Sequence, residues 1–332
     1  MATLTAVWTE LSTDDKLQRS SQSVALIDDK LFIFGGELVA RHPRDNELFE
    51  LKPDGQAEPR SLEVSAAKPT SRVGATMTAV KNKLYVFSGR GGVAMAPVDE
   101  SGSLQVYDVQ HASWTTIAPM EPGAAVPEAR SYHCATTDGS SRVFIHAGCP
   151  EKGRLKDLWS FDINRRLWTR HPDAPGSPRG GSSIAYADGK LWRMNGFDGQ
   201  HEIGGAIDVF DIQHNTWSTI EYMADGKTGP GARSVASLVA ANVQGQTYLV
   251  TMFGEADPSS LGHAGAGKML NDSWAFDVLG KEWKKLVATT DKVPIPRGWF
   301  DATTVGDGKI VVTGGLADSN ERIPDAWLLA IS

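Results

Sequence analysis

The sequence predicts an all-β fold in which units of four short strands recur along the chain. Each unit begins with an arginine that follows a turn and opens a stretch of alternating residues, as in RSSQSVALI and RVGATMTAV. A more apolar run then closes on glycine, as in LFIFGG, and the last strand of a unit opens on tryptophan. Alternation with a period of two between turn residues indicates strands, and helical periodicity is almost absent.

The arginines that open the units set their number. They are Arg19, Arg72, Arg130, Arg179, Arg233 and Arg297, with a mean spacing of about 56 residues. A four-stranded unit of this size cannot bury both of its faces alone, so the units must pack against one another. The sequence therefore predicts a six-bladed β-propeller that occupies residues 1–332 as a single domain.

The two ends of the chain predict how the ring closes. The sixth unit ends at PDAWLLAIS, its third strand, and TAVWTEL around Trp8 precedes the first arginine as an extra fourth strand. Pairing of these segments would complete the last blade and remove two exposed edges. The first unit has no tryptophan in its fourth strand and is expected to be the least regular.

The composition points away from nucleic acid and membranes. The 332 residues carry a formal net charge of −7, so a nucleic-acid partner is not expected. The N-terminus lacks the basic and apolar regions of a signal peptide, and no apolar run is long enough to span a bilayer. Cys134 and Cys149 lie among strand-like residues and are expected to be reduced, buried thiols. The expected location is cytoplasmic.

The opening arginines, Arg72 and Arg130 among them, are expected to surround the mouth of the central channel. They either bind carbonyl groups of a neighbouring blade or form a positive pocket for sulfate, phosphate or carboxylate. Arg90 follows LYVFSG and begins a connection on the same face, either as a pocket residue or as a solvated loop residue. Trp299, two residues after Arg297, is either an apolar surface at the mouth or a core aromatic residue.

The stretch FGEADPSSLGHAGAG follows the second strand of the fifth unit, on the same face as Arg90. It places Glu255, Asp257 and His263 within nine positions. Two carboxylates and an imidazole suit a weakly held Fe(II) or Mn(II) ion with open positions for substrate. The alternative is an exposed loop in which the carboxylates order the backbone and His263 is a polar wall or general acid.

The repeat resembles the kelch family, whose marks are the second-strand glycines and fourth-strand tryptophans. The stretches FGGELVARHPRDNELFEL, PEARSYHCA, GEADPSSLGHAGAG and PIPRGWFDA are similar to stretches of the plant specifier proteins. Those are the epithiospecifier, nitrile-specifier and thiocyanate-forming proteins, all kelch propellers. This resemblance implies an enzyme that acts on an unstable thiohydroximate-O-sulfate and needs ferrous iron.

The same resemblance implies a set of site residues. The iron motif of the family is a glutamate, an aspartate four residues later and a histidine four residues after that. Glu255 and His263 match this spacing, but Ser259 occupies the middle position and Asp257 lies two residues earlier. Glu255, Asp257 and His263 are the implied Fe(II) ligands, and Glu255 and His263 are also implied in catalysis. The anion-binding arginines that the resemblance implies are Arg90 and Arg130. Arg72 and Trp299 are further candidates for substrate binding because of their expected place at the channel mouth.

These observations leave three interpretations of function. The first is a specifier-type lyase acting on a small, reactive, anionic metabolite. The second is a cyclase or isomerase of a biosynthetic pathway that needs shape and hydrogen bonds but no metal. The third is a kelch adaptor that binds acidic peptides through its arginines. The chain has no residues left for an accessory adaptor domain, which favours an enzyme, and a homodimer is among the assemblies that the sequence permits.

Overall fold

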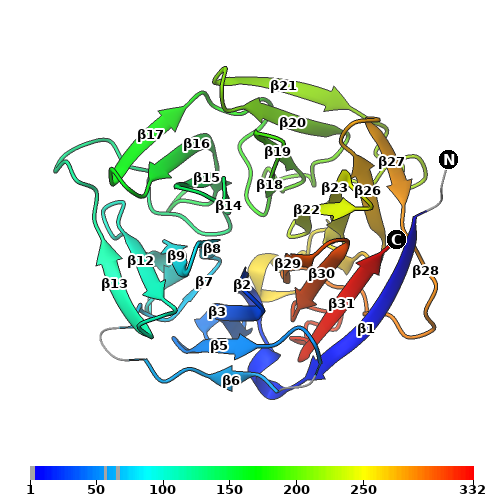
Figure 1. The fold of residues 1–332 in the computed structure, drawn as a ribbon, viewed down its shortest axis with the longest axis horizontal. Helices are drawn as coiled ribbons and strands as arrows, with labels where there is room; N and C mark the ends of the chain where they lie inside the picture. The colour runs from blue at the N-terminus through cyan, green and yellow to red at the C-terminus, as the bar shows by residue number, and fades with distance from the viewer. Residues whose placement is uncertain (1–3, 56–57, 65–67) are drawn as a thin grey trace.

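The computed structural model describes residues 4–55, 58–64 and 68–332, and these residues form antiparallel sheets around a common centre (Figure 1). Each main sheet has its first strand nearest the centre and its last strand at the periphery. The helices of the described residues are η1 (Asp15–Leu17) and η2 (Gly262–Ala264), and neither could cross a membrane.

The first three main sheets follow one another along the chain, each running from an inner to an outer strand. The first contains β2 (Ser20–Ile27), β3 (Lys30–Val39), β5 (Leu48–Leu51) and β6 (Arg60–Ser61), with β4 (His42–Pro43) paired to β3. The second contains β8 (Thr76–Val80), β9 (Lys83–Phe87), β12 (Leu104–Asp108) and β13 (Ser113–Ile117). The third contains β14 (Cys134–Thr137), β15 (Arg142–Gly148), β16 (Leu155–Asp162) and β17 (Leu167–His171).

The remaining sheets follow the same order. The fourth contains β18 (Ser183–Ala187), β19 (Lys190–Met194), β20 (Ala206–Asp211) and β21 (Thr216–Glu221). The fifth contains β22 (Ser237–Val243), β23 (Gln246–Met252), β26 (Ser273–Asp277) and β27 (Glu282–Lys285). The sixth contains β29 (Asp301–Gly306), β30 (Lys309–Thr313), β31 (Asp325–Ile331), β1 (Thr5–Thr13) and β28 (Val287–Ala288). Smaller sheets pair β7 (Arg72–Val73), β10 (Arg90–Gly91) and β11 (Ala96–Pro97), and also β24 (Glu255–Asp257) and β25 (Lys268–Met269).

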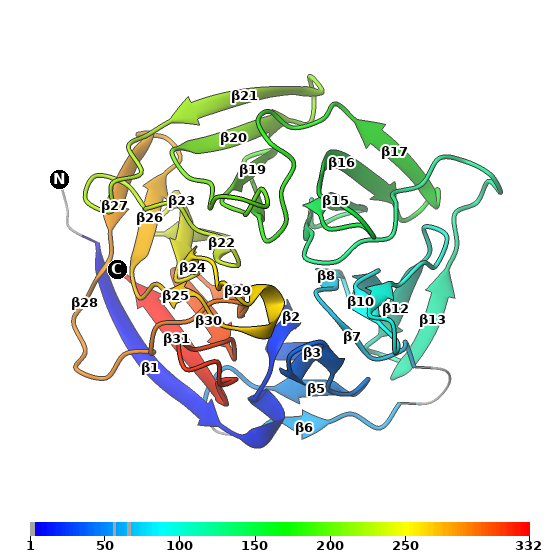
Figure 2. The same cartoon turned by 180° about the vertical axis from the view of Figure 1, so that it is seen from behind.

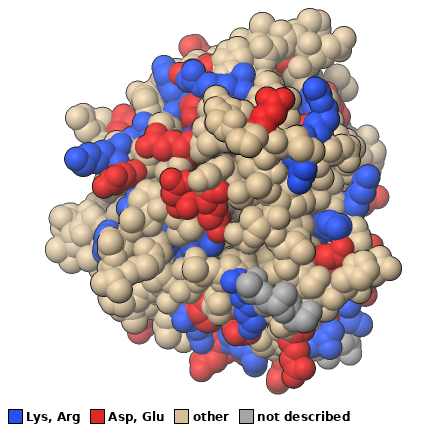
Figure 3. Space-filling model, turned by 90° about the vertical axis from the view of Figure 1, so that its left-hand side faces the viewer, with Lys and Arg blue, Asp and Glu red and all other residues tan. Residues whose placement is uncertain are grey.

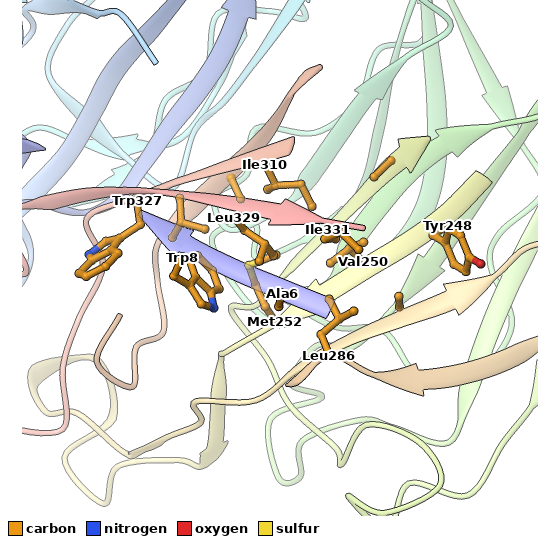
Figure 4. Packing of buried hydrophobic residues seen from close by; sticks show 14 of the residues in the cluster. Ala6, Trp8, Tyr248, Val250, Met252, Leu286, Ile310, Trp327, Leu329 and Ile331 are labelled. Carbon is orange, nitrogen blue, oxygen red and sulfur yellow. The ribbon is translucent and has the colours of Figure 1, made fainter. Parts of the chain in front are cut away.

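The N-terminal strand β1 pairs antiparallel with β31, the last strand of the chain, as the sequence predicted. Trp8 lies opposite Leu329 and Glu10 lies opposite Trp327. Figure 4 shows Trp8 and Ala6 of β1 beside residues of the fifth and sixth sheets, including Met252. The burial of these apolar side chains ties the first residues of the chain to its last ones.

The hydrophobic core is divided among the interfaces between neighbouring sheets. Trp114 in β13 packs on Phe34 of the preceding sheet, with ring centroids 5.5 Å apart, and Trp168 in β17 packs on Phe87 in the same way. Trp8 repeats this contact on Phe253, with ring centroids 5.7 Å apart. These fourth-strand tryptophans therefore join the second and third sheets each to the sheet before it, and β1 supplies the corresponding tryptophan for the sixth sheet.

A cycle of backbone hydrogen bonds surrounds the centre of the molecule. Its members each lie two residues after one of the opening arginines and have φ between 46° and 61°. They are Ser21, Gly74, Tyr132, Gly181, Val235 and Trp299. Each amide donates to the carbonyl of the member in the preceding sheet, and Ser21 donates to Trp299, with N···O distances of 2.7–3.0 Å. We call this cycle the hydrogen-bond collar.

The collar has a conformational cost that the sequence partly avoids. Left-handed backbone is unfavourable for residues with a Cβ atom, and glycine adopts it without that penalty. Gly74 and Gly181 also face neighbours closely, because a Cβ on Gly74 would lie 2.7 Å from the ring of Tyr132. Tyr132 and Trp299 accept the strained conformation, which places two aromatic side chains at the channel mouth.

The surface carries both signs of charge. Figure 3 shows Lys and Arg interspersed with Asp and Glu on the side of the molecule it views, without a continuous basic stripe. A basic stripe would indicate binding to a nucleic-acid backbone. This face therefore gives no structural reason to expect such a partner.

Candidate functional site

The opening arginines are buried structural residues, which corrects the prediction that Arg72 and Arg130 bind substrate. Arg130 is fully buried and donates to both carboxylate oxygens of Asp157, at 2.6 and 2.9 Å, and to the carbonyl of Ala147 at 3.1 Å. Arg72 is also buried and donates to Glu100 and to the carbonyl of Ser88. Their guanidinium groups pair with carboxylates inside the protein and do not line the pocket described below.

The acceptors of these arginines belong to the same repeat unit, not to a neighbouring blade. The carboxylates lie just before the third strand of the unit or within its first three residues, and several of them start an Asp-x-Trp motif that sequence reasoning missed. In this motif the tryptophan Nε1 donates to the same carboxylate, as Trp159 does to Asp157 at 2.8 Å. The same pattern occurs at Asp272 with Trp274 and at Asp325 with Trp327.

A cationic pocket lies on the face formed by the connections between second and third strands, which is the face seen in Figure 2. Its volume is about 190 Å³. Arg90, Arg41 and Arg154 line it from the second, first and third sheets, and His263 lines it from the fifth. Antiparallel order brings all of these connections to one edge of the ring, which is why residues so distant in sequence meet.

Arg154 has a guanidinium group with capacity for a ligand. The described residues offer it no hydrogen bond, and its Nε is buried without a partner. It stands over the ring of Phe197, with Cζ 4.9 Å from the ring centroid. A Cβ on Gly199 would lie 2.7 Å from Arg154 Nη1, so that glycine makes room for the side chain. Sequence reasoning missed Arg154, although it occupies the same type of connection as Arg90.

Arg90 lines the pocket, as expected, and is held there by its neighbours. Its Nε donates to Ser131 Oγ at 3.1 Å, and its two Nη atoms donate to the carbonyls of Met95 and Pro150. Each Nη atom carries a second hydrogen, so the guanidinium keeps donor capacity for a ligand. The substrate-binding role of Arg90 stays a prediction.

The pocket lining holds three arginines and two glutamates. Glu37 is buried and accepts from Arg322 Nη2 at 2.9 Å. Arg322, which does not line the pocket, therefore compensates the negative charge of Glu37. Glu151 is exposed. The thiol of Cys149 also lines the pocket and is free, as is Cys134, and burial raises the pKa of the Cys149 thiol.

His263 belongs to a cluster of three rings at the channel mouth. Its ring stacks on Tyr132, with centroids 5.3 Å apart, and meets Trp299 edge-on at 5.4 Å. Tyr132 and Trp299 also contact each other and line the axial channel of about 480 Å³. His263 keeps an exposed side, but desolvation lowers its pKa, and the nearby arginines lower it further. The neutral imidazole can accept a proton at neutral pH.

The predicted metal ligands do not converge. Glu255 is buried and its carboxylate accepts from the amide of Gly267 at 2.7 Å, whereas Asp257 is exposed. His263 packs in its aromatic cluster instead of facing them. Across the described ranges, no group of three His, Cys, Asp or Glu side chains is placed to hold a metal ion. The arrangement therefore does not fit the Fe(II) site that the family resemblance implied, and it places Glu255 outside the pocket lining.

The carboxyl group of Glu202, which sequence reasoning missed, lies near Phe197. Glu202 forms an isolated bridge with Phe197, on which Arg154 stands. Both of its carboxylate oxygens are buried without a hydrogen-bond partner. The pKa of Glu202 is raised to about 8, chiefly by burial and to a smaller extent by Glu255, against the lowering effect of the adjacent Ser234 hydroxyl.

Comparison with known proteins shows the family to which the chain belongs. A profile of the KLHDC2/KLHL20/DRC7 Kelch-repeats domain matches residues 21–254, and the chain belongs to the kelch-repeat family. It is similar to an N-(sulfonatooxy)prop-2-enimidothioate sulfolyase of Thlaspi arvense, with 27% identity over 95% of this chain and 93% of that protein. The likeness to the specifier proteins inferred from the sequence is thereby confirmed.

Two further comparisons concern the fold. Adagio-like protein 1 of Oryza sativa subsp. japonica is 28% identical over 59% of this chain, which spans about a third (31%) of that longer protein. The solved structure titled "Structure of YjhT" matches 97% of this chain and 99% of its own, with a TM-score of 0.72 and 15% identity. That likeness concerns the fold alone.

Proposed function

We propose that this chain is a closed, six-bladed kelch propeller with an enzymatic site at the mouth of its channel. The pairing of β1 with β31 and the hydrogen-bond collar support the closure, since the collar returns from Trp299 to Ser21. A closed ring protects the strand edges that an open stack would expose. It also holds the connections that line the pocket on a rigid frame.

The proposed activity is that of a lyase or isomerase on a small anionic metabolite, of the specifier type in its substrate class. The observation that carries it is the Arg154 guanidinium, which lines a pocket with Arg90 and lacks a hydrogen bond among the described residues. Guanidinium groups bind sulfate, phosphate and carboxylate with paired hydrogen bonds. The similarity to the Thlaspi sulfolyase favours a sulfated substrate.

The geometry supports a simple division of roles. Arg154 and Arg90 would bind the anionic group and stabilise the charge that a leaving sulfate acquires. The neutral His263 would accept or hold a proton, and Tyr132 and Trp299 would position the rest of the substrate. A reaction that needs only orientation, charge stabilisation and proton transfer fits these residues, which favours the metal-independent form of the activity.

Replacement of Arg154 by methionine is expected to weaken binding of methyl sulfate about tenfold, because one charge-assisted hydrogen-bond donor is lost. Titration calorimetry measures this. Arg165→Met is the matched control, since Arg165 is exposed in the turn between β16 and β17 at the opposite edge of the ring. Both substitutions remove one positive charge. Equal weakening by both would show a general charge effect and contradict the anion pocket.

Addition of Fe(II) is expected to leave the melting temperature and the activity unchanged, because Glu255, Asp257 and His263 do not converge. Anaerobic thermal denaturation with Fe(II) or a chelator measures this. Ser259→Asp restores the spacing of the family motif and provides the comparison. A rise in melting temperature that saturates at one Fe(II) per chain of the unaltered protein would contradict the metal-independent form, while the anion pocket would stand.

A further inference from the structure

The fourth unit departs from the arginine–carboxylate pattern of the other units. In those units the opening arginine donates through Nη1 and Nη2 to a carboxylate of its own unit. The pairs are Arg19 with Asp45, Arg72 with Glu100, Arg130 with Asp157, Arg233 with Asp272 and Arg297 with Asp325. Arg179, which opens the fourth unit, is 6% exposed and donates through Nε and Nη1 to the carbonyls of Ser177 and Asn195. The described residues offer its Nη2 no hydrogen bond.

The strand register identifies the residue that replaces the carboxylate. Phe161 in β16 and Phe210 in β20 each lie opposite the tryptophan of the next strand, so these two phenylalanines are equivalent. Asp157 lies four residues before Phe161, and Ala206 lies four residues before Phe210. Ala206 therefore occupies the position from which Asp157 binds its arginine in the third unit. The fourth unit keeps the arginine and lacks the carboxylate.

The indole that accompanies the carboxylate in the third unit is replaced as well. Asp208 stands in β20 at the position of Trp159 in β16, and its carboxylate pairs with Arg193, which lies opposite it in β19. Arg193 is fully buried, and its Nη1 also donates to the carbonyl of Pro175 at 3.0 Å. Its Nε and Nη2 are buried and have no partner in the part of the chain that the structure describes. Buried N–H groups are rarely left unpaired, so these two indicate an acceptor from outside the chain.

One short segment holds the two arginines side by side. The carbonyl of Pro175 accepts from Arg193, and the carbonyl of Ser177 accepts from Arg179. A Cβ on Gly176, between them, would lie 3.0 Å from Arg179 Nη2. Because Gly176 and Ser177 are exposed, this Nη2 lies close beneath the surface. Burial lowers the pKa of Arg179 to about 10, and the charge of Arg193 contributes to the lowering.

We propose that the fourth unit binds a small carboxylate from outside the chain, held by Arg179 and Arg193 where other units have an acidic residue of their own. Across the described ranges, Asp208 is the one carboxylate that bonds either guanidinium group, and buried charges are normally paired. A carboxylate suits the site because aspartate differs from Ala206 by one carboxylate group, and guanidinium groups bind carboxylates in pairs of hydrogen bonds. Neither arginine lines the cationic pocket or the axial channel, so this site is separate from the proposed enzymatic site.

Thermal denaturation in sodium formate and in sodium chloride at equal ionic strength tests the proposal, with formate as the smallest carboxylate. The melting temperature of the unaltered protein is expected to be about 2–4 °C higher in formate, with saturation, because a ligand of the folded state stabilises it. Ala206→Asp supplies the carboxylate from the chain itself. This variant is expected to melt at a higher temperature in chloride and to lose the additional gain in formate. Formate bound at the cationic pocket would act equally on both proteins, so their difference reports on the fourth unit.

Asp157→Ala is the positive control, because it creates the same vacancy beside Arg130 in the third unit. It is expected to lose stability in chloride and to recover part of it in formate. Arg179→Gln is expected to lose the formate response of the unaltered protein, and it provides the comparison if Ala206→Asp does not fold. Equal formate responses of the unaltered protein and these two fourth-unit variants would overturn the proposal, because formate would then act elsewhere. A response of Asp157→Ala alone would also overturn it, because water would then satisfy Arg179 and Arg193.

Discussion

Replacement of Arg130 by alanine is expected to lower the free energy of unfolding by about 3–5 kcal/mol, the usual cost of removing one partner of a buried ion pair. The guanidinium is fully buried and bonds Asp157, Ala147 and the carbonyl of Glu128. Its loss leaves the carboxylate of Asp157 with the indole of Trp159 as its remaining side-chain donor. Urea denaturation followed by fluorescence measures the change.

Two other arginines give matched controls for this prediction. Arg170 is exposed and pairs with the exposed Asp173, so Arg170→Ala is expected to cost at most about 1 kcal/mol. Arg179 opens the fourth unit but bonds no carboxylate among the described residues, and it donates instead to the carbonyls of Ser177 and Asn195. Arg179→Ala is therefore expected to cost clearly less than Arg130→Ala. An Arg130→Ala protein of unchanged stability that has lost only ligand binding would contradict the structural role of Arg130.

The architecture was accessible from the sequence because its signals are local and repeated. Trp8 lies in a strand-like segment that precedes the first unit, and the sixth unit lacks a fourth strand. The pairing of β1 with β31 therefore followed from the number of strands in each unit. The positions of Arg90 and His263 on one pocket followed from topology alone, since both lie in connections between second and third strands. Periodicity and strand order are sufficient for inferences of this kind.

The partners of individual side chains were not accessible in the same way. The sequence placed Arg130 at the channel mouth, but the choice between Asp157 and a ligand depends on side-chain directions of residues 27 positions apart. The Asp-x-Trp motif was a usable signal, because a carboxylate at or just before the start of the third strand recurs with the arginine. The carboxylate of Glu255 accepts from the amide of Gly267, twelve residues away, and no spacing rule reveals this partner.

The contribution of Glu202 to stability is expected to fall as pH rises from about 5 to above 8, and Glu202→Gln is expected to remove it. His133, His146, His171 and His263, whose pKa values burial lowers, act in the opposite direction up to about pH 7 and are retained in the variant, so the test is the difference between the two pH profiles. Burial holds the pKa of Glu202 at about 8, against an ordinary value of 4.5. Below pH 4.5 both folded and unfolded chains are protonated at this site, so it costs nothing. Between pH 4.5 and about 8 the unfolded chain releases this proton, whereas the folded chain retains it. Each unit of rising pH in this range therefore lowers the free energy of unfolding.

The expected size of the Glu202 effect is on the order of 2 kcal/mol above pH 8, because the side chain is only half-buried and solvent screening reduces the full shift. Urea denaturation from pH 5 to 9 measures it, with Glu151→Gln as the control at an exposed carboxylate on the same face. Asp301, whose pKa burial raises to about 7, contributes in the same direction and is retained in both variants. Glutamine keeps the shape of the protonated carboxyl but cannot ionise, so Glu202→Gln should match the unaltered protein near pH 5 and exceed its stability above pH 8. Parallel pH profiles for the two proteins would show that Glu202 ionises normally, and the carboxyl beside Arg154 would then be an ordinary anion at neutral pH.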